Sequence, residues 1–229
     1  MSNEPPGGHA ALVDFAELAR QPDPSLEALT LAVAAEFRDV DSRAVEERLD
    51  ALGAELAAEI GPGATPGEEA AACARVLGGR HGFAGNVERY DDPENSMLDL
   101  VLERRTGLPI LLSIVYVEAA RRAEVDLRGV GLPGHYVVGH FATAPPLLFD
   151  PFAGGRPLGE APNPSFVRPW EAAQETVLRV LNNLVGAYGR RSDLGREIRA
   201  AELRLALPLG PEARTQLDGE LRALRARLN

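Results

Sequence analysis

Two polar residues of opposite acid–base character stand at the edges of short strand-like runs in the middle of the chain. His135 follows Pro133-Gly134, and Asp150 precedes Pro151. On adjacent antiparallel strands a carboxylate can bind an imidazole, fix its tautomer and stabilise its charged form, which is the orienting role of the acid in catalytic triads. The spacing alone also fits a plainer interpretation, in which the histidine satisfies a local turn and the aspartate begins another. Both interpretations remain open at this point.

A nucleophile for such a pair would be expected at the start of a buried helix, where the helix dipole lowers the pKa of a thiol. The helical run before the strands begins at Pro109, and no cysteine stands there. Ser113, one turn further along, is the hydroxyl in the apolar part of that helix before Tyr116. The single cysteine, Cys73, lies in an alanine-rich stretch and is predicted to be a small buried helix residue.

The elements that must position these residues predict an α+β fold. The run from Pro109 to Arg122 is apolar nearly all round, which is typical of a helix buried on most sides. Proline suits the first helical position, because that N–H has no partner in the helix. Runs rich in Val, Phe and Tyr follow over residues 127–132, 135–141 and 147–152. They predict antiparallel strands against which the helix packs.

Four regions are predicted along the chain: a loose tail over 1–9, an N-terminal helical region over 10–78, the α+β core over 79–165 and a C-terminal helical region over 166–229. Ser25 is expected to cap a helix in the N-terminal region. In the core, Asn95-Ser96 is expected to open a helix that ends at a left-handed Gly107. The C-terminal region looks like a tetratricopeptide-type hairpin. Because a stacked array needs about three units, we interpret this region as an appendage.

A series of short motifs runs through the core over about residues 80–160. The segments are Phe83-Ala84-Gly85-Asn86, Tyr90, Pro93, Asn95-Ser96, Arg104 to Ile110, Tyr116 to Arg121, Gly129-Val130, Pro133-Gly134-His135 and Asp150-Pro151-Phe152. In order, spacing and residue type these motifs resemble the SirB1 family of transglutaminase-like proteins.

The resemblance implies a papain-like transglutaminase core with a nucleophile helix followed by strands that carry a histidine and an aspartate. His135 matches the core's histidine and Asp150 its aspartate, while Pro109 occupies the cysteine's place. Asn86, Tyr90 and Asn95 belong to the same pattern and are weaker candidates for a binding site. The two asparagines also fit simpler roles, Asn86 in a turn and Asn95 in a helix cap.

Composition excludes several other functions. The net charge is −10, a field that repels phosphate backbones, so no nucleic-acid partner is expected. The longest apolar run, 110–117, is too short to cross a bilayer, and no secretory leader is recognisable. His81 and His140 lack companions at metal-ligand spacing. No cofactor, metal or membrane partner is therefore expected, and the protein is predicted to be bacterial and cytoplasmic.

Three functions from different classes remain open. The first is a pseudoenzyme that binds a protein, peptide or small ligand in a groove lined by His135, Asp150 and Ser113. The second is a hydrolase or acyltransferase in which Ser113 replaces the thiol, which requires a general base within about 2.6–3.2 Å of its hydroxyl. The third is a helical interaction scaffold in which the core only supports the C-terminal helices.

Overall fold

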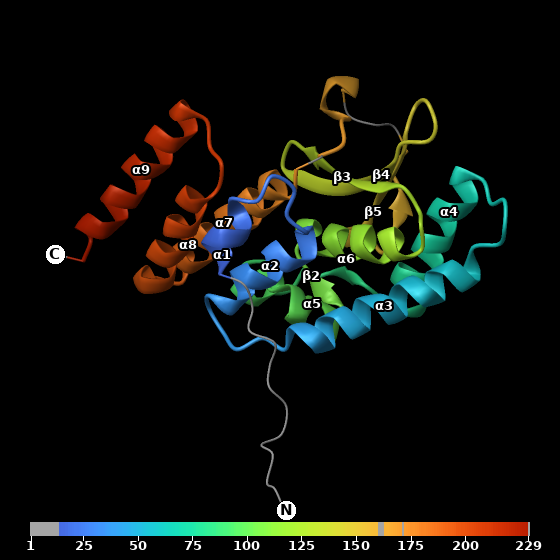
Figure 1. Cartoon of the computed structure of the whole chain (residues 1–229), viewed down its shortest axis with the longest axis horizontal. Coiled ribbons are helices and arrows are strands. Elements are labelled where there is room, and N and C mark those ends of the chain that lie inside the picture. The colour runs from blue at the N-terminus through green and yellow to red at the C-terminus, as the bar shows by residue number, and fades with distance from the viewer. Residues whose placement is uncertain (1–13, 160–162, 171, 229) are drawn as a thin grey trace, which may run out of the picture.

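The computed structural model describes residues 14–159, 163–170 and 172–228, and its core is the expected α+β arrangement (Figure 1). Four antiparallel strands form one sheet in the order β3-β4-β5-β6, and helix α6 runs along one face of it. The bounds are β3 (Leu127–Leu132), β4 (His135–His140), β5 (Leu147–Asp150), β6 (Arg156–Pro157) and α6 (Pro109–Arg122). The predicted strands are thus confirmed, the second and third ending a little earlier than expected.

Helix α6 begins where the sequence predicts. Pro109 takes the first helical position, and Leu108 is the N-cap residue, with an extended backbone and no side-chain cap. The backbone N–H of Leu108 instead donates to the carbonyl oxygen of Asn95 at 3.1 Å. The apolar residues of α6 are buried except for Val117, which is partly buried, and they lie between the sheet and the helices below. The helix is therefore a rigid central element on which the site is assembled.

From residue 14 onward, the described part of the N-terminal region forms four helices and a π-helical turn. They are α1 (Phe15–Ala19), α2 (Leu26–Ala35), α3 (Ser42–Glu59), α4 (Pro66–Cys73) and the turn Ala74–Arg80. The Ser25 hydroxyl accepts from the N–H of Ala28 at 3.3 Å, so the predicted cap of α2 is confirmed. The predicted tail over residues 1–9 lies outside the described residues.

The segment before α6 differs from its prediction. Helix α5 (Leu98–Arg104) has Met97 as its N-cap residue without a side-chain cap, so the predicted cap at Asn95-Ser96 is wrong. The left-handed residue after α5 is Arg105, with φ of 60°. Gly107 instead lies in β2 (Thr106–Gly107), which pairs in parallel with β1 (Ala84–Gly85). A Cβ on Gly107 would lie 2.7 Å from Val101, so a close approach requires this glycine rather than a left-handed turn.

The C-terminal region folds into α7 (Ala173–Arg190), α8 (Leu194–Ala206) and α9 (Pro211–Ala226). Helix α7 packs against α2, and α1 packs against α8, so helices of the N-terminal and C-terminal regions lie side by side (Figure 1). One hydrophobic cluster runs from Phe15 through α6 to Leu207. The described helices include none with the length and apolar character needed to cross a membrane.

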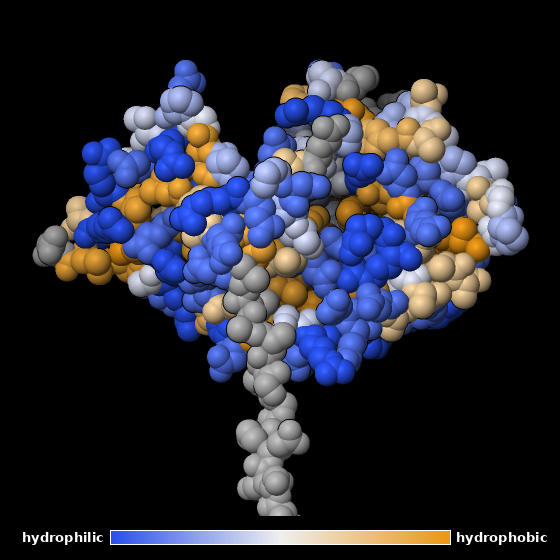
Figure 2. All heavy atoms as spheres, in the orientation of Figure 1, coloured by the Kyte–Doolittle hydropathy of each residue, from blue (hydrophilic) through white to orange (hydrophobic). Residues whose placement is uncertain are grey.

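The surface is mostly hydrophilic on the face drawn in Figure 2, where apolar patches are small and interrupted by charged side chains. The same view shows a notch in the outline between the helical arm that ends in α9 and the part of the molecule built on the sheet.

Candidate functional site

His135 and Asp150 form a hydrogen-bonded pair, which we call the dyad. His135 opens β4 and Asp150 closes β5, and the ring Nε2 lies 2.8 Å from Oδ2 of the carboxylate. The other carboxylate oxygen, Oδ1, accepts from the backbone N–H of Phe152 at 2.9 Å. Asp150 therefore both begins the turn and orients the ring, and the predicted pairing is confirmed. The two side chains are 30% and 17% exposed, so a ligand in solvent can reach the histidine.

Aromatic rings surround the exposed side of the dyad. Phe152 meets the His135 ring edge-on at 6.3 Å between centroids, and Tyr90 meets Phe152 at 6.0 Å. Gly85 makes this arrangement fit, because a Cβ there would collide with the Phe152 ring. Tyr90 remains half exposed. The predicted candidate Tyr90 thus lies next to the dyad through one intervening ring.

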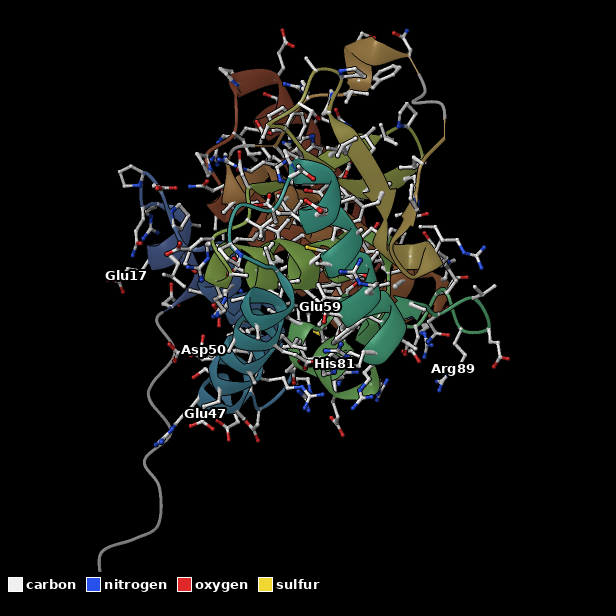
Figure 3. The ribbon with its side chains drawn as sticks, turned by 90° about the vertical axis from the view of Figure 1, so that its right-hand side faces the viewer. Glu17, Glu47, Asp50, Glu59, His81 and Arg89 are labelled. Atoms are coloured by element: carbon white, nitrogen blue, oxygen red, sulfur yellow. The ribbon has the colours of Figure 1, made fainter. Side chains whose placement is uncertain are left out.

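The loop that carries Tyr90 is held by the two predicted asparagines. Asn86 donates from Nδ2 to Oδ1 of Asn95 at 2.9 Å and accepts from the N–H of Arg89 at 3.1 Å. Asn95, which is 2% exposed, donates to the carbonyl oxygen of Arg89 at 2.7 Å and to that of Tyr90 at 3.3 Å. Arg89 projects outward from this loop (Figure 3). The asparagine side chains thus bond within the loop and position Tyr90.

The start of α6 opens onto a small cavity of about 100 Å³. Leu108, immediately before Pro109, lines it together with Tyr90 and Asn183. Pro109 has no ionisable or nucleophilic group, and its ring occupies the first turn of the helix. The structure therefore places the helix start near the ring of Tyr90, without a nucleophile there.

Ser113 lines a cavity to which the dyad does not contribute. Its side chain is fully buried, and its Oγ makes no hydrogen bond with any residue in the described ranges. It lines a larger cavity of about 560 Å³ on the side of α6 that faces Tyr136 and Thr176, and the residues lining that cavity include neither His135 nor Asp150. The structure therefore gives no hydrogen bond from Ser113 to the dyad.

Cys73, His81 and His140 make no hydrogen bond to His135 or Asp150. Cys73 is fully buried, and burial, with a smaller effect of the Glu69 charge, raises the pKa of its thiol to about 12. His81 pairs with Glu55 at 2.6 Å, and buried His140 pairs with Glu69 at 2.6 Å. Within the described residues no group of three or more potential metal ligands comes together.

Sequence reasoning missed one residue of this neighbourhood, Arg179 in α7. Its Nη2 donates to the carbonyl oxygen of His135 at 2.8 Å and to that of Leu132 at 3.4 Å, across the turn between β3 and β4. Nothing in the sequence marks it, because it is one arginine among many on a helix outside the matched motifs. Only the packing of α7 against the sheet brings it to His135.

The arrangement of a buried helix followed by strands that carry a paired histidine and aspartate is that of a papain-like core. The sequence model described as the transglutaminase-like superfamily, Transglut_core2, matches residues 43–182. This chain therefore belongs to the transglutaminase-like superfamily.

Similar proteins are found in bacteria. A UPF0162 protein of Xylella fastidiosa (strain Temecula1) is 33% identical over 210 residues, which cover 83% of this chain and 74% of the relative. The UPF0162 protein PA3419 of Pseudomonas aeruginosa is 35% identical over 140 residues, 61% of this chain and 50% of the relative. A shorter stretch of 56 residues is 39% identical to F-box only protein 21 of Mus musculus, 24% of this chain and 9% of that protein. No solved structure matches the chain.

Proposed function

We propose that this protein is a SirB1-like pseudoenzyme, which binds a peptide at the dyad and does not form an acyl-enzyme. The observation that carries the proposal is the coexistence of an assembled histidine–aspartate pair with Pro109 at the start of the helix. A histidine and an aspartate can orient and polarise a bound group, but covalent catalysis also needs an activated nucleophile.

The remaining nucleophiles do not fill this gap. Cys73 is sealed from solvent, and because burial raises the pKa of its thiol to about 12, almost none of it is thiolate near neutral pH. Ser113 lines a cavity whose lining residues exclude His135, and its Oγ has no base as a partner among the described residues. These contacts support the binding function over the serine hydrolase.

The dyad has a free hydrogen-bonding group for a ligand. With Nε2 bound to Asp150, no hydrogen bond from the described residues reaches the ring's Nδ1. A neutral ring that donates from Nε2 presents Nδ1 as an acceptor, and a charged ring presents it as a donor. The rings of Tyr90 and Phe152 beside it offer apolar contact area, which is typical of sites that bind peptides.

Two assays test the proposal. Amine incorporation and peptide hydrolysis are measured on the wild type and on His135→Ala, Cys73→Ser and Ser113→Ala, and no turnover is expected from any of them. Binding of randomised, fluorescein-labelled octapeptide pools is followed by fluorescence polarisation, and His135→Ala is expected to weaken it. Turnover lost in Cys73→Ser would refute the absence of thiol chemistry, and turnover lost in both His135→Ala and Ser113→Ala would establish the serine enzyme. Pools that bind His135→Ala as well as the wild type would refute binding at the dyad.

A further inference from the structure

Arg179 carries a charge without an acidic partner among the described residues. Two more deeply buried arginines show the usual compensation: Arg122 pairs with three carboxylates, and Arg204 pairs with Glu220 at 3.0 Å. A guanidinium removed from water normally needs such a partner, because the desolvation of a charge is costly. Burial lowers the pKa of Arg179, as expected where no carboxylate offsets it.

Two aromatic rings hold this guanidinium in place. Its central carbon lies 5.6 Å from the centroid of the Tyr136 ring and 5.9 Å from that of Trp170. The two rings meet edge-on at 5.2 Å, and we call them the aromatic clamp. Cation–π contacts of this kind stabilise an arginine but leave its N–H groups free to donate.

Two glycines of β3 leave the space that the aromatic clamp occupies. A Cβ on Gly131 would collide with the Trp170 indole, and a Cβ on Gly129 would collide with the Tyr136 hydroxyl. The backbone N–H of Trp170 also donates to the carbonyl oxygen of Gly129 at 2.9 Å. The clamp and the guanidinium that it holds are therefore fixed before any ligand arrives.

The free donors of Arg179 are available to a ligand. Only Nη2 bonds to the described residues, through the carbonyl oxygens of His135 and Leu132. Nε and Nη1 make no hydrogen bond to the described residues, and neither atom is sealed from solvent. A guanidinium presents such donors in a planar fork, which matches the two oxygens of one carboxylate.

From these contacts we infer that Arg179 binds a carboxylate of the ligand that occupies the dyad. This inference rests on the proposed function for the identity of the site. Arg179 donates to the backbone carbonyl oxygen of His135, so the carboxylate would bind beside the strand end that carries the ring of the dyad. The net charge of −10 disfavours polyanions and leaves a ligand with one or few carboxylates as the suitable class.

Trp170 provides the readout, because it is the single tryptophan of the chain and contacts Arg179. Its fluorescence is titrated with N-acetyl-dialanine as the free acid, with N-acetyl-aspartate amide and with N-acetyl-dialanine amide. The two acids are expected to give a saturable change with a Kd on the order of 1 mM, and the uncharged amide none. The stronger of the two acids identifies a terminal or a side-chain carboxylate as the natural group.

Variants separate binding from support of the turn. Arg179→Gln is expected to weaken the acids by about tenfold or more, and Arg179→Lys by less, because lysine keeps the charge but loses the fork. The matched control is Arg214→Gln, since Arg214 also donates to a backbone carbonyl, that of Leu207, but contacts no aromatic clamp. Its Kd is expected to equal that of the wild type.

Three results would overturn the inference: equal binding of acids and amide, an unchanged Kd in Arg179→Gln, or no saturation at roughly a hundred times the expected Kd. If Arg179→Gln does not fold, the comparison of acid with amide on the wild type still decides. His135→Ala distinguishes the two proposals, because it should weaken binding of the peptide pools while the acids still perturb Trp170. Acids that bind while the pools do not would refute the proposed function alone.

Discussion

Arg122 joins three helices through ion pairs, two of which are buried, and removing its charge should destabilise the protein far more than removing an exposed one. Its Nη2 lies 2.7 Å from Glu27 of α2, its Nε 2.6 Å from Asp50 of α3, and its Nη1 3.0 Å from Glu118 of α6. The side chains of Arg122, Glu27 and Glu118 are 11%, 12% and 4% exposed, respectively. Arg122→Met keeps the apolar part of the side chain packed against Gly53, where a Cβ on the glycine would collide with the Cβ of Arg122.

The expected loss of free energy of unfolding follows from the carboxylates that Arg122→Met leaves without a partner. Breaking a buried pair costs about 3–5 kcal/mol, because the surviving carboxylate stays buried and uncompensated. Arg121 still reaches Glu118 at 3.0 Å, and Asp50 is 62% exposed, so the lower end, about 3 kcal/mol, is expected. For a chain of this length that corresponds to a fall in Tm of about 6–12 °C.

Urea denaturation of Arg122→Met and of a matched control, Arg43→Met, tests this reasoning. Arg43 pairs with Glu47 at 2.8 Å, but the two side chains are 82% and 65% exposed, so solvent screens the pair and the control should lose far less free energy of unfolding than Arg122→Met. Adding Glu118→Gln to Arg122→Met should recover part of the loss, because the uncompensated charge is removed. The reasoning fails if both single variants lose the same free energy, or if the double variant is simply additive.

Three further outcomes are expected. Gly85→Ala drives a methyl group into the Phe152 ring and should cost about 1–3 kcal/mol and shift the NMR signals of the His135 ring; Gly61→Ala, where a Cβ meets nothing within 4 Å, should change neither, and an equal effect of both would contradict the packing. Cys73 should react with a thiol reagent at pH 8 only after unfolding. Because burial raises the pKa of its thiol from 9.0 to about 12, its contribution to stability is present below pH 9 and is lost as the pH rises toward 12; labelling of the native protein at pH 8 would refute this. Tyr116→Phe removes a buried hydroxyl without a partner in the described ranges and should raise the free energy of unfolding by about 1 kcal/mol in urea; a clear loss would reveal a partner for that hydroxyl.

Local patterns predicted the elements that carry the dyad. Proline at the start of an apolar run was enough to locate α6, because the missing N–H and the all-round burial both act within one segment. The pairing of His135 with Asp150 was predicted from their places on successive strands together with the family resemblance, since spacing alone also fitted two separate turns. These features depend on neighbours in sequence or on adjacent strands.

Features that depend on distant packing were not predicted. Gly107 was interpreted as the end of a helix, whereas its position is set by pairing with Gly85 and by close approach of Val101. Arg179 reaches His135 only because α7 crosses the turn between β3 and β4. Such contacts join residues that are far apart in the sequence, so the local spacing of residue types does not predict them.

The contact between α2 and α7 has a consequence for synthesis of the chain on the ribosome. Seven of the ten residues of α2 are buried in the finished protein, partly against α7, a helix that begins at Ala173. At about 5–20 residues per second, α7 is made roughly 7 to 30 s after α2 begins at Leu26. During that interval the apolar surface of α2 lacks part of its cover. A ribosome that stalls before α7 is therefore expected to leave a product that exposes apolar surface and is prone to aggregation.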